Sequence, residues 1–590
     1  MKIKRVADFR NMLRKAGLDG FIQPRNDEYI GEYVPEASAR LAWLTGFTGS
    51  AGLAVVLEDT AAVFSDGRYT LQLAAQTDPA IWERLHIMET PPHLWLKEHA
   101  PSGGRIGYDP WLMTPAAIAK YAQCGCDLVP AANPVDALWT DRPVPPASEV
   151  VPHDLAFAGE PAAEKRARIA SRLSGNAGAV MLTDPHALAW LFNIRAADLP
   201  HTPIALGFAL LRRDASATIF MEPARFPAAT RAHLGDAVDV QPRAAMADAL
   251  ARLAGERVQL DPATSPIWFT QTLKQAGAVI VEADDPCVLP RAIKNPIEQD
   301  GARAAHLRDG MAMCRFLAWL ADAAPRGGET ELSAAAKLRG FRAQAPEFRA
   351  ESFAPISGAG EHGAIIHYSA DEASNRPIRP NEVYLIDSGG QYPDGTTDIT
   401  RTVWTGPDTA SGTPPREIAE RFTRVLAGHI ALATAMFPEG VAGPHLDALA
   451  RAPLWQAGLD YDHGTGHGVG SYLSVHEGPV SFHRAAKPVP LAAGMILSDE
   501  PGYYQPGGYG IRLENLLLVV PGEVIGPKRF LAFETLTLAP FDRRLILPEL
   551  LDAAALDWLD AYHARVLEAL APGLGVQDRA WLTEACAPLA

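Results

Sequence analysis

The sequence predicts a multidomain protein of mixed α/β and α+β class, in which two related α/β domains precede a domain of long helices and largely antiparallel strands. Three observations lead to this prediction. The chain has 590 residues, which is too long for one hydrophobic core and corresponds to about three or four domains. Two proline-bearing polar stretches, 140–154 and 284–296, divide the chain in the manner of linkers. The first two segments also share a sequence pattern.

The shared pattern begins with a four-residue match. Leu-Ala-Trp-Leu at 41–44 recurs at 188–191. An apolar run precedes each copy and paired apolar runs follow it, an order typical of a strand, a helix and a β-hairpin. We therefore expect related domains over residues 1–150 and 151–292. The apolar runs are 20–22, 53–57 and 61–64 in the first copy and 179–182, 208–211 and 217–220 in the second.

The third segment begins with a strong helix signal. Asn295 can cap a helix whose first residue is Pro296, and Glu298 stands where the acid of a capping box is found. We assign residues 293–535 to this domain and residues 536–590 to its C-terminal extension. The other expected elements are helices at 414–436, 445–459 and 551–589 and strands at 383–386, 399–404, 495–497 and 511–520.

Composition limits the functional class. Hydrophobic residues make up 48% of the chain and charged residues 21%, values typical of a folded soluble protein. The net charge is −16 and no stretch is rich in lysine or arginine, which disfavours nucleic acid and anionic membranes as partners. The N-terminus lacks the apolar core of a signal peptide, and no run approaches the length of a membrane span. We expect a cytoplasmic protein with small or peptide ligands.

The cysteines agree with a reducing compartment. There are five, an odd number that argues against a disulfide framework. Cys124 and Cys126 form the only close spacing. Because no second cysteine or histidine pair lies nearby, we interpret them as packed or exposed thiols rather than as a zinc or redox site.

Two acids flank a predicted hairpin in the third segment. Asp387 follows the apolar run 383–386, a turn is expected at Asp394 and Gly395, and Asp398 enters the return strand. This arrangement would set Asp387 and Asp398 side by side, where two carboxylates repel each other unless positive charge lies between them. Two solvated acids beside a hairpin are the alternative interpretation.

A run rich in histidine and glycine follows. His463, His467 and His476 lie within sixteen residues that also hold five glycines. Glycine lets a loop bend close to a centre, and neutral imidazole is a common metal ligand. Downstream, Glu500 follows an apolar run and Glu514 stands in a very apolar predicted strand, where an unpaired carboxylate would be costly to bury. A glycine-rich turn with incidental histidines is the alternative, whereas a phosphate-binding P-loop is disfavoured because no Lys-Ser/Thr follows.

The charges of these groups suggest two metal ions. Four carboxylates carry four negative charges, which two divalent cations would neutralise, and His467 supplies a fifth ligand. Mostly oxygen ligands with one imidazole suit Mn²⁺, whereas thiolate-rich sites prefer zinc. We expect two divalent ions, with Mn²⁺ first and Zn²⁺ or Co²⁺ as alternatives. The five ligands are Asp387, Asp398, His467, Glu500 and Glu514.

Two such ions would support hydrolysis of an amide. They lower the pKa of a shared water and polarise the scissile carbonyl. The amino terminus of a peptide could meet one ion and Asp387, which would restrict cleavage to the first residue. Arg512, two residues before Glu514 in the same expected strand, would share its face and either hold the ligand carboxylates or face the substrate. A surface arginine is the alternative.

These motifs resemble the pita-bread metallopeptidases, and among them the long, three-domain form of aminopeptidase P, also called Xaa-Pro aminopeptidase. The order of the five ligands is similar to the pattern of that family, and all five positions are filled. The resemblance extends over nearly the whole chain. The motifs that carry the resemblance are at 46–52, 65–69, 189–195, 363–368, 463–470 and 475–479.

The resemblance implies two creatinase-like N-terminal domains and a pita-bread catalytic domain, in which helices cover a curved, mainly antiparallel sheet. It implies that Asp398 and Glu514 bridge the metals, that Asp387 chelates one, and that His467 and Glu500 complete the other. It further implies a homodimer formed through the catalytic domain, with the C-terminal extension as a possible contact.

The implied reaction is hydrolysis of the N-terminal Xaa-Pro bond of a peptide by a hydroxide that bridges the two metals. His367 and His476 would orient substrate, stabilise the tetrahedral intermediate or pass protons, with Glu500 as a proton carrier. His463 matches a residue that helps to form the pocket for the second-position proline.

Two other functions compete with this one. A prolidase cleaves Xaa-Pro dipeptides with the same metal ligands on the same fold. The presence of the N-terminal domain 1–150 and the residues of the motifs favour aminopeptidase P. A metal-free peptide- or protein-binding module, or the metal-free hydrolase creatinase, has the same fold, but the intact ligand set weighs against both.

Overall fold

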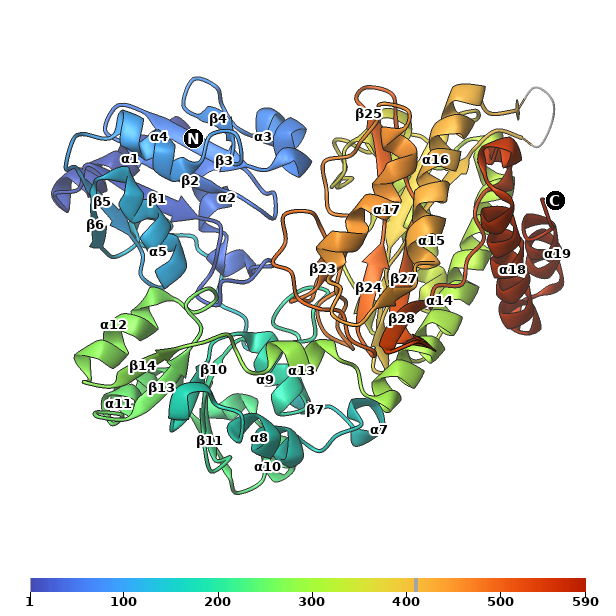
Figure 1. The fold of residues 1–590 in the computed structure, drawn as a ribbon. Helices are drawn as coiled ribbons and strands as arrows, with labels where there is room; N and C mark the ends of the chain where they lie inside the picture. The colour runs from blue at the N-terminus through green and yellow to red at the C-terminus, as the bar shows by residue number, and fades with distance from the viewer. Residues whose placement is uncertain (1, 408–411, 590) are drawn as a thin grey trace. The chain divides into compact units, whose positions relative to one another are not determined.

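The computed structural model describes residues 2–407 and 412–589 (Figure 1). The chain divides into two compact units. One comprises Met1–Asp154 and Glu160–Val288, and the other Leu155–Gly159 and Leu289–Ala590.

The first unit contains two six-stranded sheets with the same topology. Their orders are β4-β3-β2-β1-β5-β6 and β12-β11-β10-β8-β13-β14. In each sheet the inner strand, β1 or β8, pairs antiparallel with the strand that follows its helix and parallel with the strand on its other side. The strands are β1 (Gly20–Pro24), β2 (Leu53–Leu57), β3 (Ala61–Ser65), β4 (Glu83–His86), β5 (Arg105–Tyr108), β6 (Asp127–Pro130), β8 (Ala179–Leu182), β10 (Phe208–Arg212), β11 (Ala217–Phe220), β12 (Val238–Gln241), β13 (Arg257–Leu260) and β14 (Val279–Glu282).

The helices of the first unit surround these sheets. The repeated Leu-Ala-Trp-Leu falls in α2 (Arg40–Thr45) and in α9 (Pro185–Leu191), each of which connects the inner strand to the hairpin. The expected order of strand, helix and hairpin is therefore confirmed in both copies. The other elements are α1 (Lys2–Lys15), α3 (Thr70–Gln76), α4 (Pro92–His99), α5 (Pro115–Tyr121), α6 (Pro134–Leu138), β7 (Val151–Pro152), α8 (Ala162–Ala170), β9 (Ile194–Arg195), α10 (Ala228–Leu234), α11 (Met246–Ala251) and α12 (Ile267–Gln275). Helix α13 (Val288–Ala292) begins at the last residue of the first unit and continues in the second.

The second unit combines long helices with antiparallel strand pairs. Its main sheets have the orders β16-β17-β20 and β21-β28-β27-β24. The strands are β15 (Ala350–Glu351), β16 (Ile356–Ala359), β17 (Val383–Ser388), β18 (Gly390–Tyr392), β19 (Gly395–Thr396), β20 (Ile399–Trp404), β21 (Phe437–Pro438), β22 (Gly466–His467), β23 (Ser481–Phe482), β24 (Ile496–Asp499), β25 (Gly502–Gln505), β26 (Tyr509–Arg512), β27 (Asn515–Ile525) and β28 (Lys528–Thr535).

The helices of the second unit bury apolar faces against these strands. Residues Phe316 and Leu320 pack with Tyr384 and Ile386 of β17 in one core cluster, and α16 packs against α17 and β24 (Figure 1). The predicted fold class, two related α/β domains followed by an α+β domain, is confirmed. The helices are α7 (Leu155–Ala158), α14 (Pro296–Ala323), α15 (Glu331–Arg342), α16 (Arg416–Ala433), α17 (Gly443–Trp455), α18 (Ala553–Leu570) and α19 (Val576–Ala585).

The capping signal before α14 is confirmed. Asn295 Oδ1 accepts from the Glu298 amide at 3.1 Å, and Glu298 Oε2 accepts from the Asn295 amide at 3.0 Å. This reciprocal pair satisfies amides that the first turn of a helix leaves without intrahelical partners.

Two element predictions differ from the structure. The expected helix 551–589 is interrupted, since α18 (Ala553–Leu570) and α19 (Val576–Ala585) are separate helices. The expected strand 511–520 is broken, since β26 ends at Arg512 and β27 starts at Asn515. Between them, the Leu513 amide donates to Pro501 O and the Glu514 amide to Thr400 O, at 3.3 and 3.2 Å. The backbone here leaves its pairing with β25 and turns to pair with β24. Arg512 and Glu514 therefore do not share the face of one strand.

Candidate metal centre

The predicted ligands come from five places around the sheets of the second unit. Asp387 lies in β17, Asp398 immediately before β20, and His467 at the end of β22. Glu500 directly follows β24, and Glu514 lies in the break before β27. Each of these positions is at or beside a strand. The two glutamates, which lie outside the strands, are held by backbone bonds from the Glu500 amide to Thr465 O at 2.8 Å and from the Glu514 amide to Thr400 O at 3.2 Å.

The predicted hairpin between the two aspartates is more elaborate than a single turn. Strands β17 and β20 pair in antiparallel register, with Asp387 opposite Thr400 and Ser388 opposite Ile399. The short hairpin of β18 and β19 stands between them, and its turn contains the expected Asp394. Asp398 is thus brought next to the end of the strand that carries Asp387.

Three of the five side chains form a compact group. Asp398, His467 and Glu514 each offer one ligand atom, and these atoms lie within 4.8 Å of one another. His467 Nε2 is 3.5 Å from Asp398 Oδ2 and 3.7 Å from Glu500 Oε1. The His467 ring also presents one nitrogen to a carbonyl, because Nδ1 is 3.0 Å from Gly468 O. That bond holds the proton on Nδ1 and leaves Nε2 for a metal.

The carboxylates fit a cation. Asp387 Oδ1, Asp398 Oδ1 and Glu514 Oε1 are buried and have no hydrogen-bond partner among residues 2–407 and 412–589. A buried carboxylate oxygen without a partner is costly, so these atoms need positive charge. Oxygen ligands with one imidazole are a donor set that divalent ions accept.

The pKa shifts of the carboxylates have the same origin. Burial, together with the charges of Asp398 and Glu500, raises the pKa of Asp387 to about 7, although Arg512 opposes the shift. Burial also raises the pKa of Glu500, and burial with the neighbouring acids raises that of Glu514 well above its ordinary value. Carboxylates that repel one another therefore lie close together, and this arrangement is stable only when cations or protons compensate their negative charge.

The pKa of His467 shifts in the opposite direction from that of an ordinary buried histidine. Burial lowers its pKa, but the hydrogen bond with Asp398 and the charge of Glu500 outweigh it and raise the value to about 9. A metal ligand must be a neutral imidazole, so a cation bound at Nε2 would displace this proton.

Arg512 lies among the ligands as a buried cation. Its Nη2 donates to Asp387 Oδ2 at 2.6 Å, and its Nε donates to Thr400 Oγ1 at 3.3 Å. Thr400 Oγ1 in turn donates to Glu514 Oε2 at 2.8 Å. Of the two roles considered for Arg512, this geometry favours holding the ligand carboxylates.

Two of the predicted substrate-binding histidines, His476 and His463, are linked to this group by contacts. The rings of His467 and His476 are 4.3 Å apart at an interplanar angle of 70°. His463 Nε2 forms a 2.8 Å hydrogen bond with the Tyr504 hydroxyl, which also accepts from Arg512 Nη1 at 2.8 Å. His367 is half-buried in the segment that follows β16.

Several supporting residues were not found from the sequence. Thr400 follows Asp398 by two residues and could have been inferred from strand alternation. Tyr504 had no sequence signal, because only the register of β25 with β26 brings it beside Arg512. Glu477 is another supporting residue that the sequence did not reveal. It accepts from Lys294 Nζ at 2.5 Å and lies 3.2 Å from Arg291 Nε, and both of these basic residues precede α14.

Comparisons with known proteins agree with this geometry. Residues 300–521 match the model of metallopeptidase family M24, and residues 529–589 match the C-terminal region of the same peptidase. Residues 5–138 and 141–298 each match the creatinase/prolidase N-terminal domain. Aminopeptidase P2 of Arabidopsis thaliana is 38% identical over 97% of this chain and 86% of its own length.

The chain belongs to metallopeptidase family M24. Xaa-Pro aminopeptidase 2 of Sus scrofa is 37% identical to this M24 chain over 98% of it and 88% of the relative. The crystal structure of X-prolyl aminopeptidase from Caenorhabditis elegans, described as a cytosolic enzyme with a di-nuclear active site, superposes with a TM-score of 0.94. It shares 32% identity and covers 100% of both chains. The resemblance to aminopeptidase P, and with it enzymatic activity as a hydrolase, is confirmed.

Proposed function

We propose that this M24 chain is a metal-dependent aminopeptidase that hydrolyses the N-terminal Xaa-Pro bond of peptides. The observation that carries the proposal is the cluster of buried carboxylates around His467, in which three oxygens lack partners among the described residues. The match of Xaa-Pro aminopeptidases to nearly the whole chain supports the substrate class.

We assign the metal site to the five predicted ligands. Asp387, Asp398, His467, Glu500 and Glu514 would hold two divalent ions, with Mn²⁺ proposed first because carboxylates dominate the donor set. The bound ions would supply Lewis acidity toward the scissile carbonyl and a nucleophile at neutral pH. The di-nuclear centre of the Caenorhabditis elegans enzyme supports the number of ions.

The chain's own residues would bind and orient the peptide around these ligands. His476, ring to ring with His467, and His367 would place the substrate and stabilise its developing charge. His463, fixed by Tyr504, would border the pocket of the second-position proline. Glu500 would hold or pass the proton. Arg512 acts on the ligands, because it fixes Asp387.

The remaining assignments extend this proposal. Within the described residues, no helix has both the length and the apolar character needed to cross a bilayer. We propose that the protein is a cytoplasmic homodimer. The description of the Caenorhabditis elegans enzyme as cytosolic supports the proposed location. We also retain 1–150, 151–292, 293–535 and 536–590 as proposed domain limits.

The test combines metal removal with ligand substitution. Chelator-treated protein is expected to lose cleavage of Xaa-Pro-Xaa peptides and to regain it with Mn²⁺, and Glu514→Ala is expected to abolish it because a buried ligand is removed. The matched control is Glu523→Ala, an exposed acid of the strand that follows. Metal content is measured alongside, by elemental analysis.

The outcomes separate the candidate functions. Cleavage of Xaa-Pro dipeptides but not of Xaa-Pro-Xaa would establish the prolidase alternative. Activity that survives both chelation and Glu514→Ala would exclude the metal mechanism. A protein that binds peptides without hydrolysing them when loaded with metal would belong to the binding-module class.

A further inference from the structure

A second buried carboxylate lies outside the metal centre. Glu331 is the first residue of α15, and its side chain is 0% exposed. Burying an ionised carboxylate is costly unless hydrogen bonds surround it. The groups that solvate it show what this side chain is for.

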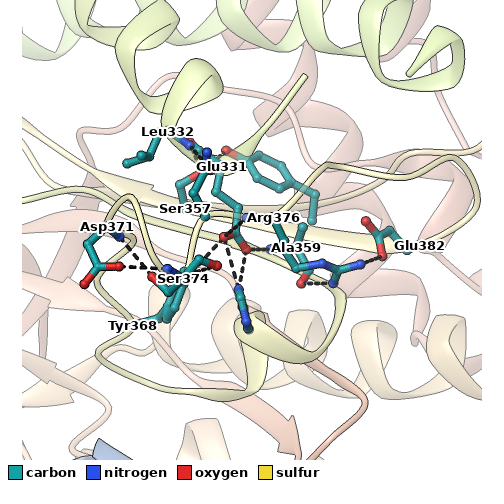
Figure 2. Close-up of polar contacts among 12 residues, drawn as sticks. Glu331, Leu332, Ser357, Ala359, Tyr368, Asp371, Ser374, Arg376 and Glu382 are labelled. Carbon is teal, nitrogen blue, oxygen red and sulfur yellow. Dashed lines mark hydrogen bonds and ion pairs between the residues drawn. The ribbon is translucent and has the colours of Figure 1, made fainter. Parts of the chain in front are cut away.

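Four donors from one segment converge on Glu331 (Figure 2). Oε1 accepts from the Ala359 amide at 2.9 Å, and His362 Nδ1 lies 2.9 Å from the same oxygen. Oε2 accepts from the Tyr368 hydroxyl at 2.8 Å and from the Arg376 amide at 3.2 Å. One side chain thus holds four groups of the segment 356–376 in place.

The backbone of Glu331 adds two more bonds to the same segment. Its amide donates to Arg376 O at 3.1 Å, and its carbonyl accepts from Ser357 Oγ at 2.7 Å. Arg376 closes the segment on itself, since its guanidinium donates to Ala359 O and to Glu382 Oε2 (Figure 2). The two ends of the segment are therefore held together over Glu331.

The same segment borders the metal centre. It starts in β16, where Ile356 is opposite Asp387 in the register with β17. Further along, Gly363 approaches Gly510 of β26 so closely that a Cβ on Gly510 would lie 1.7 Å from Gly363 O. The segment is thus clamped to Glu331 and pressed against the strand that ends in Arg512.

His367 occupies the middle of this clamped segment. It directly precedes Tyr368, whose hydroxyl is bound to Glu331 and also donates to Ser374 O at 3.2 Å. A side chain on a loop is placed accurately only when the backbone on both sides of it is fixed. Glu331 fixes that backbone through Ala359 and His362 before His367 and through Tyr368 and Arg376 after it.

We propose that Glu331 is a positioning residue for the reaction, which acts by holding the segment 356–376 so that His367 faces the substrate. The inference rests on the proposed function, because it gives His367 a role in peptide hydrolysis. Glu331 itself contacts neither the ligands of the metal centre nor the substrate in this role.

The test is a double-mutant cycle on the Mn²⁺-loaded full chain. Glu331→Gln keeps the shape of the side chain but turns an amide NH₂ toward backbone and side-chain donors, so the clamp loses acceptors. It is expected to lower kcat for a Xaa-Pro-Xaa peptide by about 10²-fold, the cost of a displaced catalytic group. In a His367→Ala background the same change should lower kcat by less than about twofold, because the group it positions is absent.

Controls exclude a general loss of structure. Glu372→Gln makes the same chemical change at an exposed position of the same loop and is expected to leave kcat unchanged. Metal content should equal that of the wild type in every variant. Hydrogen exchange of peptides from 356–376 should accelerate in Glu331→Gln, a readout that does not depend on activity.

A gentler variant covers the case in which Glu331→Gln does not fold. Tyr368→Phe removes one donor to the carboxylate without opening a cavity, and its smaller effect on kcat should likewise vanish in the His367→Ala background. Equal losses of kcat in both backgrounds, for either variant, would overturn the positioning role. An inactive wild-type enzyme with a loosened 356–376 segment in Glu331→Gln would instead overturn the proposed function.

Discussion

Arg512 and Tyr504 show how single residues build the metal centre. The guanidinium reaches Asp387 directly and Glu514 through Thr400, so one cation connects two of the proposed ligands. It also brings a positive charge that a count of the four carboxylates leaves out. Tyr504 joins this cation to His463, since its hydroxyl contacts both side chains at 2.8 Å. Hydrogen bonds through Tyr504 therefore connect the proposed ligands to the predicted proline pocket.

This coupling gives a prediction for Tyr504→Phe. The variant loses a hydroxyl that accepts from Arg512 and bonds to His463, so both partners lose orientation. The loss of one such hydrogen bond is worth about tenfold in kcat/KM toward Xaa-Pro-Xaa peptides, with metal content unchanged. Steady-state kinetics measure it. Tyr503→Phe is the matched control, because it removes the hydroxyl of the neighbouring tyrosine, whose ring packs against Arg421 instead. An equal loss of kcat/KM in both variants would contradict the coupling.

At the scale of elements, helix α18 secures the strands beneath the site. Tyr562 bonds to Arg401, which in turn donates to Glu514 O and to Asn515 Oδ1. The adjacent His563 accepts from the Phe541 amide through Nε2, at 3.1 Å. Helix α18 therefore satisfies polar groups of the chain that surrounds the break between β26 and β27. It is part of the C-terminal extension, which has a structural role independent of any dimer contact.

His563 makes this docking sensitive to acid. Burial and the charge of Arg401 lower the pKa of His563 from 6.5 to about 4, because both disfavour the charged ring. Only the neutral ring can accept the hydrogen bond from the Phe541 amide. Below pH 6.5 the unfolded chain binds the proton and the folded chain does not, so stability falls as the pH drops toward 4. At pH 5 this group alone costs about 2 kcal/mol of unfolding free energy.

Substitution His563→Gln separates this group from the other acid-sensitive groups. The amide oxygen can accept from Phe541 without titrating, so the loss of stability between pH 7.5 and pH 5 should be about 2 kcal/mol smaller than in the wild type. Urea denaturation at the two pH values measures the difference. The same pH dependence in both proteins would show that His563 is not the titrating group.

At the scale of the whole molecule, the two units differ in where their stability comes from. The first unit has two closed α/β cores, with apolar strands such as β3 and β8 buried along their whole length. The second unit buries a group of mutually repelling carboxylates between its sheets. Only the second unit should therefore depend on bound cations for part of its stability.

Metal binding is expected to show this difference directly. At a free Mn²⁺ concentration of one hundred times the dissociation constant, binding adds about 2.7 kcal/mol to the stability of the unit that holds it. Hydrogen exchange with and without a chelator should thus change for peptides of 289–590 around the ligands and stay constant for those of 1–154 and 160–288. Equal deprotection of both units would place the stabilising ions elsewhere.

Local signals determined much of what the sequence predicted correctly. The cap at Asn295 and Glu298 starts α14, and the two Leu-Ala-Trp-Leu helices stand between an inner strand and a hairpin, because capping and periodicity act over a few residues. The family resemblance was equally accessible, since it depends on residue types in order along the chain.

The predicted strand 511–520 failed for a physical reason that also explains what the sequence could not reach. Arg512, Leu513 and Glu514 read as one apolar strand with an acid in it, yet the backbone breaks where Pro501 and Thr400 offer acceptors. Thr400 lies 114 positions from Glu514 in sequence, and Pro501 directly precedes the hairpin of β25 and β26. Tyr504 meets Arg512 across that hairpin, whose register the sequence does not show, and the bonds of Glu331 join α15 to a segment much further along the chain. The sequence by itself determined the domain classes and the order of the proposed ligands along the chain, whereas only the tertiary structure decided which side chains hold those ligands in place, because strand register and burial set those contacts.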